Sequence, residues 1–210
     1  MLFRSVSQSR YTEYHILRHY LDLIKATLHT NFFQTNANGT TKSYFNFKLN
    51  PHLIPEIPQP IPKFEIFIYN PHIENVHLHF NNVTHNSLHW SNREEDFRTE
   101  MLGLIKAQQV KNTVIVPMGT KNNFVPRKMP IGGSHDEVMT KNITYYRIFI
   151  NDLLDITNNL KNNKIVPPQN VVHHDADDPY LIITTNKDTT TFSNITNAIV
   201  TGKQIGRAHV

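Results

Sequence analysis

Five prolines lie within the twelve residues from Pro51 to Pro62. Proline lacks a backbone N–H donor and fixes φ, so neither a helix interior nor a central strand can cross this segment. We therefore predict an extended connector here, with regular elements on both sides. Before it, residues 44–49 alternate between apolar and polar side chains, and after it residues 64–69 and 76–80 are rich in β-branched and aromatic residues. All three segments are typical of strands.

Helices are predicted where apolar residues recur at three- and four-residue spacing, first at 16–28. The second half of the chain alternates between helices and strands, which we predict at 93–112 (helix), 113–117 (strand), 135–160 (helix), 171–172 and 180–183 (strands) and 192–199 (helix), with a loop at 118–134. Such alternation is typical of an α/β fold. We therefore expect a mixed, largely parallel sheet flanked by helices.

Composition excludes several classes of protein. The chain has no cysteine, which rules out a disulfide scaffold, a thiolate metal site and a cysteine nucleophile. Its apolar runs are far shorter than the roughly 20 residues that span a bilayer, and its first ten residues contain no secretory apolar region. We therefore expect a cytoplasmic protein without a membrane partner. The net charge of +4 comes from scattered Lys and Arg, so no nucleic-acid partner is expected.

Several long motifs carry a resemblance to a known family. They are DFRTEMLGLIKAQQVKN (96–112), VIVPMGTK (114–121), YRIFINDLLDIT (146–157), VPP (166–168) and HDADDPY (174–180), with LIKATLHTNFFQ (23–34) and PKFEIFIY (62–69) upstream. In this order and nearly without gaps, they resemble the large, bacterial-type NAD-specific glutamate dehydrogenase family. The resemblance covers roughly residues 14–199.

The resemblance implies oxidative deamination of L-glutamate to 2-oxoglutarate and ammonia, with NAD as hydride acceptor, in a homo-oligomer. In that family a first α/β domain binds the dicarboxylate and a following Rossmann domain binds NAD. This sequence contains no G-x-G-x-x-G fingerprint. We therefore expect residues 14–203 to be the substrate-binding domain, residues 1–13 to be a lead of undefined structure, and NAD to be bound by a C-terminal domain outside this chain. No cofactor-binding residue and no metal ligand is assigned here.

Three basic residues correspond to the family's substrate site. Glutamate carries two carboxylates, so its site needs fixed cations and hydrogen-bond donors. By resemblance Lys111 binds a substrate carboxylate and Lys121 is the catalytic lysine, a role that a lysine crowded by cations can perform near neutral pH. Without the flanking motif, two solvated surface lysines would be the ordinary interpretation. His85 corresponds to the family's basic residue for the distal carboxylate, but a neutral imidazole is not the permanent bidentate cation that arginine supplies.

The family's catalytic aspartate corresponds to Asn186, within the segment TTNKDTTTFS (184–193). An amide cannot accept the proton that this aspartate shuttles, and loss of a positioned general base costs about 10²–10⁴-fold in rate. We therefore expect the chain to be inactive as it stands. The alternative is a non-catalytic dicarboxylate-binding or interaction module from a decayed gene copy.

The departures from the family share a nucleotide signature. The chain holds 24 Asn and 20 Thr but only 7 Gly, and replacements such as Gly by Asn, Asp by Asn and Arg by His all follow from G-to-A changes in the coding strand. This pattern is the basis for the decayed-copy alternative. In addition, residues 204–210 match the in-frame translation of a common sequencing adapter, and we exclude them from the predicted fold.

A metal site is a rival interpretation of several histidines and acidic residues. His77 and His79 share one face of a predicted strand, and residues 173–178 (HHDADD) combine imidazoles with carboxylates, which are suitable ligands for a divalent ion. No established metal-binding spacing supports this grouping, and the resemblance places arginine at positions 79 and 173 in the family. The sequence therefore favours the dehydrogenase interpretation over a metallohydrolase.

Overall fold

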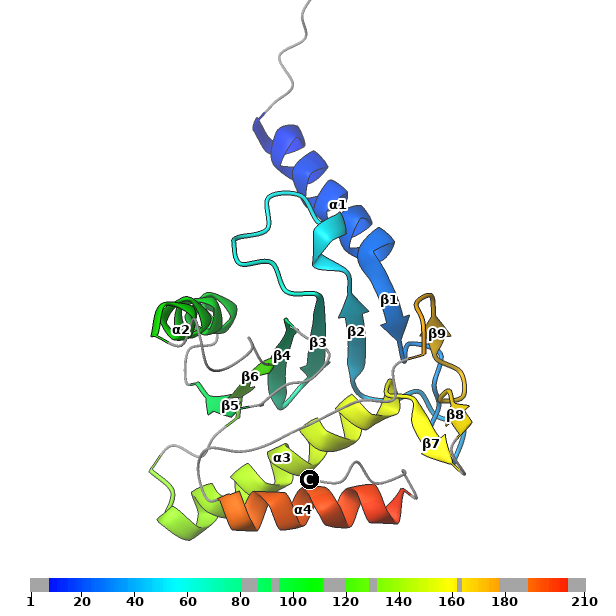
Figure 1. Cartoon of the computed structure of the whole chain (residues 1–210), viewed down its shortest axis with the longest axis vertical. Helices are drawn as coiled ribbons and strands as arrows, with labels where there is room; N and C mark the ends of the chain where they lie inside the picture. The colour runs from blue at the N-terminus through cyan, green and yellow to red at the C-terminus, as the bar shows by residue number, and fades with distance from the viewer. Residues whose placement is uncertain are drawn as a thin grey trace, which may run out of the picture.

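The computed structural model shows a mixed β-sheet with helices on both faces and one helix that projects away from the body (Figure 1). It describes residues 8–80, 87–91, 95–111, 120–128, 132–161, 164–177 and 189–203. The helices are α1 (Gln8–Ala26), α2 (Phe97–Lys111), α3 (His135–Asp155) and α4 (Thr189–Gly202), with a short 3-10 turn, η1, at Pro51–Leu53. The strands are β1 (Thr27–Thr30), β2 (Phe45–Leu49), β3 (Phe64–Asn70), β4 (Ile73–His79), β5 (Ser87–Trp90), β6 (Thr120–Pro126), β7 (Asn159–Lys161), β8 (Lys164–Val166) and β9 (Val172–His173).

Seven of these strands form one sheet in the order β5-β6-β4-β3-β2-β1-β9, and β7 and β8 pair separately. Within the described strands, only β5 and β6 run parallel, and every other neighbouring pair is antiparallel. The sheet is therefore mixed, as predicted, but the prediction that it is largely parallel is wrong. The reason lies in the connections, because two residues join β3 to β4 and a parallel crossover needs a dozen or more.

The strands predicted on either side of the prolines are confirmed as β2, β3 and β4. The proline segment itself crosses from β2 to β3 and contains η1 as its one regular element. Pro51 stands at the start of η1, where its missing N–H costs nothing. The loop predicted at 118–134 is interrupted by β6, and the strands predicted at 113–117 and 180–183 lie outside the described residues.

One face of the sheet packs against α3 and α4. Ile66, Ile68 and Phe124 from the strands meet a continuous row of apolar side chains on α3, among them Tyr146, Phe149, Ile150 and Leu153. The ring of Phe192 on α4 lies 4.8 Å from that of Tyr146, and the Tyr146 hydroxyl is 2.7 Å from Thr196 Oγ1. Farther along, Lys203 reaches Asp155. The two helices therefore run side by side in the same direction.

The opposite face packs against α2. Phe97, Met101 and Ile105 of that helix contact Val76, Leu78 and Val125 of the central strands. Because both faces are covered, every residue of β4 is buried. The burial includes the four polar side chains of the strand, which are Glu74, Asn75, His77 and His79.

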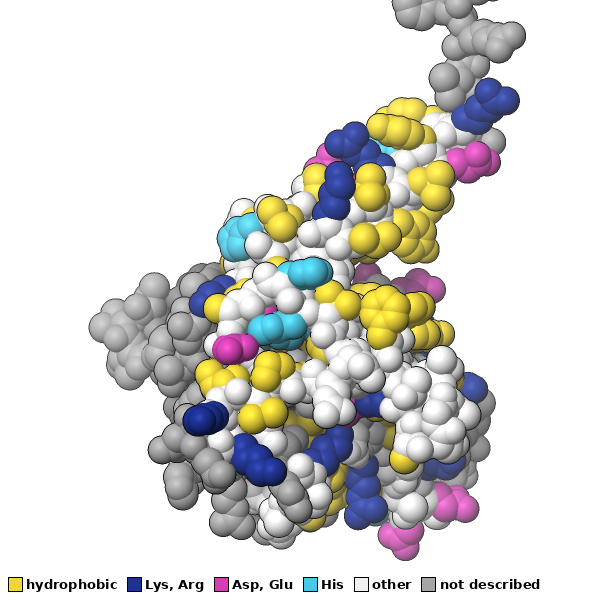
Figure 2. All heavy atoms as spheres, turned by 90° about the vertical axis from the view of Figure 1, so that its right-hand side faces the viewer, with side chains coloured by type: hydrophobic (Ala, Val, Ile, Leu, Met, Phe, Trp, Pro, Cys, Tyr) yellow, Lys and Arg dark blue, Asp and Glu magenta, His cyan; other side chains and the backbone are white. Residues whose placement is uncertain are grey.

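Helix α1 begins at Gln8, inside the segment 1–13 that the sequence left undefined, and ends at Ala26. The apolar periodicity at 16–28 did predict a helix, but most of its apolar side chains are not in the core. Leu17 and Ile24 are 68% and 69% exposed, and Figure 2 shows hydrophobic side chains along the projecting helix. Among the described helices, none is both long and apolar enough to cross a membrane.

Candidate functional site

Lys121, the predicted catalytic lysine, lies on β6. The backbone register pairs it with Leu78 of β4 on one side and with Ser87 of β5 on the other. The sequence indicated that this lysine follows a strand, whereas the structure places it as the second residue of one. Lys121 thus belongs to the sheet, at the end where the parallel strands β5 and β6 both begin.

Lys111, the predicted carboxylate-binding lysine, is the last residue of α2. Since β5 and β6 are parallel, the connection through α2 returns the chain to the end of the sheet at which β6 starts. The end of α2 therefore leads toward the end of the sheet that holds Lys121, across residues 112–119. The side chains of both lysines lie outside what the structure describes.

His85 and Asn186, the other two predicted site residues, lie outside the described residues. In the sequence His85 precedes Ser87, the first residue of β5, by two positions. Asn186 precedes Thr189, the first residue of α4, by three positions. The structure therefore gives backbone positions for two of the four predicted residues.

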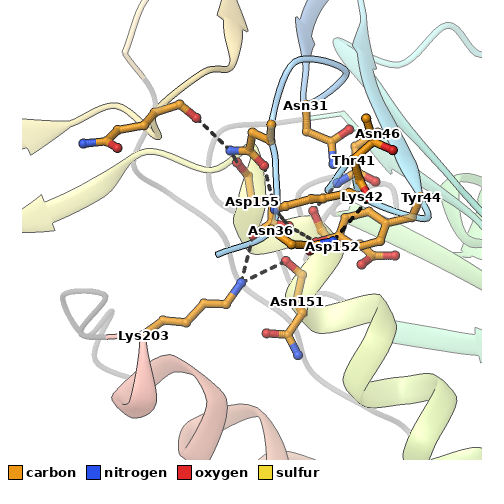
Figure 3. A network of polar contacts seen from close by, with 12 residues as sticks. Asn31, Asn36, Thr41, Lys42, Tyr44, Asn46, Asn151, Asp152, Asp155 and Lys203 are labelled. Carbon is orange, nitrogen blue, oxygen red and sulfur yellow. Dashed lines mark hydrogen bonds and ion pairs between the residues drawn. The ribbon is translucent and has the colours of Figure 1, made fainter. Parts of the chain in front are cut away.

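Among the described residues, two clusters of charged side chains lie near the C-terminal end of α3. The first, which we call the α3-end network, consists of Lys42, Tyr44, Asp152, Asp155 and Lys203 (Figure 3). Asp155 accepts hydrogen bonds from Lys42 Nζ, from the Tyr44 hydroxyl and from Lys203 Nζ, the last at 2.9 Å. Both lysines contact the same carboxylate, so this network joins the segment before β2 to the C-terminal ends of α3 and α4.

Asp152 lies one turn before Asp155 and is 1% exposed. Neither of its carboxylate oxygens has a hydrogen-bond partner among the described residues. Burial, followed by the nearby charge of Asp155, raises the pKa of Asp152 to about 8, although Lys203 and Lys42 act in the opposite direction. Asp152 is therefore a protonated carboxylic acid at neutral pH. Burial and the Asp155 carboxylate likewise raise the pKa of Tyr44 far above its ordinary value.

The second cluster, which we call the His–Asp cluster, consists of His29, Lys48, His173 and Asp175. His29 Nε2 contacts Asp175 Oδ1, and Lys48 Nζ donates to Asp175 Oδ2 at 2.7 Å. His173 Nε2 is 3.4 Å from Asp175 Oδ1, and the two imidazole rings are 4.3 Å apart. Residues from β1, β2 and β9 thus converge on one carboxylate at the edge of the sheet.

The charges of this cluster follow from its burial. Burial and the charge of Lys48 lower the pKa of His29, despite the opposing effect of Asp175. Burial alone would raise the pKa of Asp175, but the hydrogen bond and charge of Lys48, together with His29, outweigh it and lower that pKa. The cluster therefore holds an ionised carboxylate, a lysine cation and a neutral imidazole. Such a set can bind a metal ion or relay a proton.

Sequence reasoning assigned no role to His29, Lys48, Asp152 or Asp155. The only signal for the His–Asp cluster was the polar run 173–178, which contains His173 and Asp175 but not their partner on β1. His29 and Asp175 are 146 residues apart, so no local spacing could have joined them. Of the metal grouping weighed from the sequence, His77 and His79 lie together on β4 and not in this cluster.

Comparison with known proteins gives a consistent result. The profile of a family described as bacterial NAD-glutamate dehydrogenase, catalytic domain, matches residues 4–206. An NAD-specific glutamate dehydrogenase from Pseudomonas aeruginosa is 62% identical over 184 residues, which are 88% of this chain and 11% of the relative.

Two further relatives carry the same name. The protein from Halomonas elongata is 51% identical over 186 residues, covering 89% of this chain and 12% of the relative. The protein from Mycobacterium tuberculosis is 43% identical over 192 residues, covering 88% and 12%. The chain therefore spans about one ninth to one eighth of the length of the relatives it matches.

Proposed function

Because this chain belongs to the bacterial NAD-glutamate dehydrogenase family by its catalytic-domain match over residues 4–206, we propose that it is the dicarboxylate-binding part of such an enzyme. The proposed reaction is oxidation of L-glutamate to 2-oxoglutarate and ammonia. NAD supplies the hydride acceptor in that reaction, and no residue of this chain is assigned to hold it. The observation that carries the proposal is the match along nearly the whole chain.

The substrate site is proposed at the end of the sheet where β5 and β6 begin. Lys121 lies there by register with Ser87, and α2 delivers Lys111 toward the same end. His85 precedes Ser87 by two positions in the sequence. In this proposal Lys111 binds one substrate carboxylate, His85 lies near the other, and Lys121 acts on the reacting carbon.

The proton relay is the proposed defect of this chain. By resemblance Asn186 occupies the position of the aspartate that shuttles a proton on the substrate nitrogen, and an amide has no basic oxygen for this task. The proposed consequence is a chain that binds substrate and does not turn it over. Such a chain would act as a non-catalytic dicarboxylate-binding module, which is the second candidate function and rests on Asn186 alone.

Titration calorimetry of this chain with L-glutamate and with 2-oxoglutarate tests the proposed site. We expect binding that weakens at least tenfold in Lys111→Ala, since a hydrogen bond to a charged group contributes about 1.5–3 kcal/mol. Lys106→Ala serves as the matched control, because Lys106 is an exposed lysine on the same helix. Absence of binding by the unsubstituted chain, or equal binding by both variants, would contradict the site.

Two further features of the family are proposed for the longer protein. Homo-oligomerisation is expected by resemblance and is tested by sedimentation of a full-length relative that carries this segment. A cytoplasmic location is likewise proposed for the longer protein. Fractionation of cells that express a full-length relative tests that location.

A further inference from the structure

The His–Asp cluster brings three metal-binding atoms to one point outside the proposed substrate site. One ligand atom from each of His29, His173 and Asp175 lies within 4.8 Å of the others. We propose that these three residues form a binding site for a divalent transition-metal ion of the zinc type. The ion would join β1, β9 and the segment that follows β9.

The first argument is the orientation of His29. Its Nδ1 lies 3.2 Å from the carbonyl oxygen of Ile156, just beyond the end of α3. A carbonyl can only accept a hydrogen bond, so Nδ1 carries the proton. In the neutral ring, Nε2 then presents a lone pair toward Asp175 Oδ1. Metal-binding histidines almost always have this arrangement, with the remote ring N–H bonded to a carbonyl or carboxylate that fixes the tautomer.

The second argument is the orphaned nitrogen of His173. Its Nε2 is shielded from solvent and has no hydrogen-bond partner among the described residues. It faces the same Asp175 Oδ1 at 3.4 Å. A buried polar atom without a partner calls for an explanation, and an ion is one of the few available. A cation between the two imidazoles and the carboxylate satisfies all three atoms at once.

Lys48 sets the direction of the carboxylate. Its Nζ binds Asp175 Oδ2 at 2.7 Å, so Oδ1 is the oxygen left for the histidines. Lys48 is itself held, because it is the register partner of His29 and its Nζ lies 4.3 Å from the centre of the Phe64 ring. The positive charge of Lys48 also repels a metal cation bound beside it. We therefore expect weaker metal binding than in a structural site with four protein ligands.

The ligand set selects the class of metal. Two imidazole nitrogens and one carboxylate oxygen suit Zn²⁺, Co²⁺ or Ni²⁺, whereas Mg²⁺ and Ca²⁺ prefer oxygen ligands. Zinc binds such atoms at about 2.0–2.2 Å in a tetrahedron, and three protein ligands leave one position for water. By resemblance the family carries arginine at position 173. The proposed site therefore belongs to this chain and is not a general feature of its relatives.

Zinc titration of the untagged full chain, stripped with a chelator, tests the proposal. We expect one equivalent of Zn²⁺ to bind, and His173→Arg to lose that equivalent. His174→Gln is the matched control, because His174 is the exposed neighbour and should retain it. His15 and His19, four residues apart on α1, could also chelate zinc. The titrations therefore use a His15→Gln, His19→Gln background.

Two outcomes would overturn the site. One is an unchanged number of bound Zn²⁺ ions per chain in His173→Arg. The other is no zinc binding by the chain that carries His15→Gln and His19→Gln. In that case an imidazolium–carboxylate contact without metal explains the cluster. Because His173→Arg could unfold, anomalous scattering at the zinc edge from crystals of the unsubstituted chain gives an independent measurement. A peak at bonding distance from His29 Nε2 and His173 Nε2 supports the proposal, and the absence of a peak at that position contradicts it.

Discussion

Arg98 donates two parallel hydrogen bonds to Glu65, from Nε to Oε1 and from Nη2 to Oε2, each 2.8 Å long. This pair fastens α2 to β3 and so fixes the helix whose last residue is Lys111. Glu65 is buried, and Arg98 is three-quarters covered. The two residues therefore link the packing of α2 to the position of the proposed substrate site.

Removing the arginine should destabilise the fold. Arg98→Ala leaves the Glu65 carboxylate buried without its partner, and we expect a loss of about 2–3 kcal/mol in the free energy of unfolding. Arg127→Ala is the comparison, because Arg127 contacts Glu74 from a more exposed position, and such a pair contributes about 1 kcal/mol or less. Denaturant unfolding measures both. Equal losses would show that the bidentate geometry adds nothing.

The buried carboxyl of Asp152 should make stability depend on pH. Its pKa is raised to about 8 in the folded chain and is near 4 when unfolded, so the folded state binds more protons between these values. The contribution of Asp152 to stability is therefore fully present at low pH and falls as pH rises toward 8, by up to about 1.4 kcal/mol per pH unit.

Asp152→Asn removes this titration, and its unfolding free energy should be flatter between pH 5 and 8 than that of the parent. Chemical denaturation at several pH values provides the measurement. Glu56→Gln, which changes an exposed carboxylate, should leave the parent slope in place. The same slope in the parent chain and in Asp152→Asn would show that Asp152 is ionised in the fold.

The start of α3 depends on a reciprocal pair of hydrogen bonds. The Ser134 hydroxyl accepts from the Glu137 amide at 3.3 Å, and the Glu137 carboxylate accepts from the Ser134 amide at 2.9 Å. Ser134→Ala removes one of these bonds and should cost about 1 kcal/mol. Ser134→Asp can still accept from the helix N-terminus and should retain most of the stability. Thermal unfolding distinguishes the two variants, and identical melting temperatures would argue against the cap.

The proposed catalytic defect is tested in an active framework. With residues 14–203 grafted over the matching segment of the Pseudomonas aeruginosa relative, NADH formation from glutamate should fall at least 10²–10⁴-fold. By resemblance the family carries arginine at position 85 and glycine at positions 86, 87, 122 and 123. Asn186→Asp should therefore restore turnover in a graft that also carries His85→Arg, Asn86→Gly, Ser87→Gly, Asn122→Gly and Asn123→Gly. Asn194→Asp, at an exposed asparagine of α4, is the control and should restore nothing. If Asn186→Asp does not increase the rate of NADH formation, position 186 does not correspond to the catalytic aspartate.

Part of the fold was predictable because local patterns specify local structure. Residues 64–69 are rich in β-branched and aromatic side chains and form β3. The long helix predicted at 135–160 is confirmed as α3, although it ends at Asp155 and β7 begins at Asn159. β6 was missed because the sequence Thr120–Pro126 is polar in its first half. It is a strand because β4 and β5 pair with both of its edges, and no pattern within the segment reports that pairing.

The direction of the strands was mispredicted for a related reason. Alternation of helices and strands in the second half favoured a parallel sheet, but most of the sheet comes from the first half, where strands follow one another directly. The two-residue link between β3 and β4, Pro71 and His72, was the available signal for an antiparallel pair. Among the described elements, one βαβ unit, β5–α2–β6, follows the predicted parallel pattern.

By itself the sequence determined the family and the kinds of residue proposed for the substrate site. Both depend on long motifs in a fixed order along the chain, and that order can be read without the structure. The tertiary structure alone decided which distant residues meet. Asp175 contacts His29 and Lys48 because β9 adds to the edge of the sheet beside β1, and β1 pairs with β2. Such contacts depend on the order of the strands within the sheet. The spacing of residues along the chain does not specify that order.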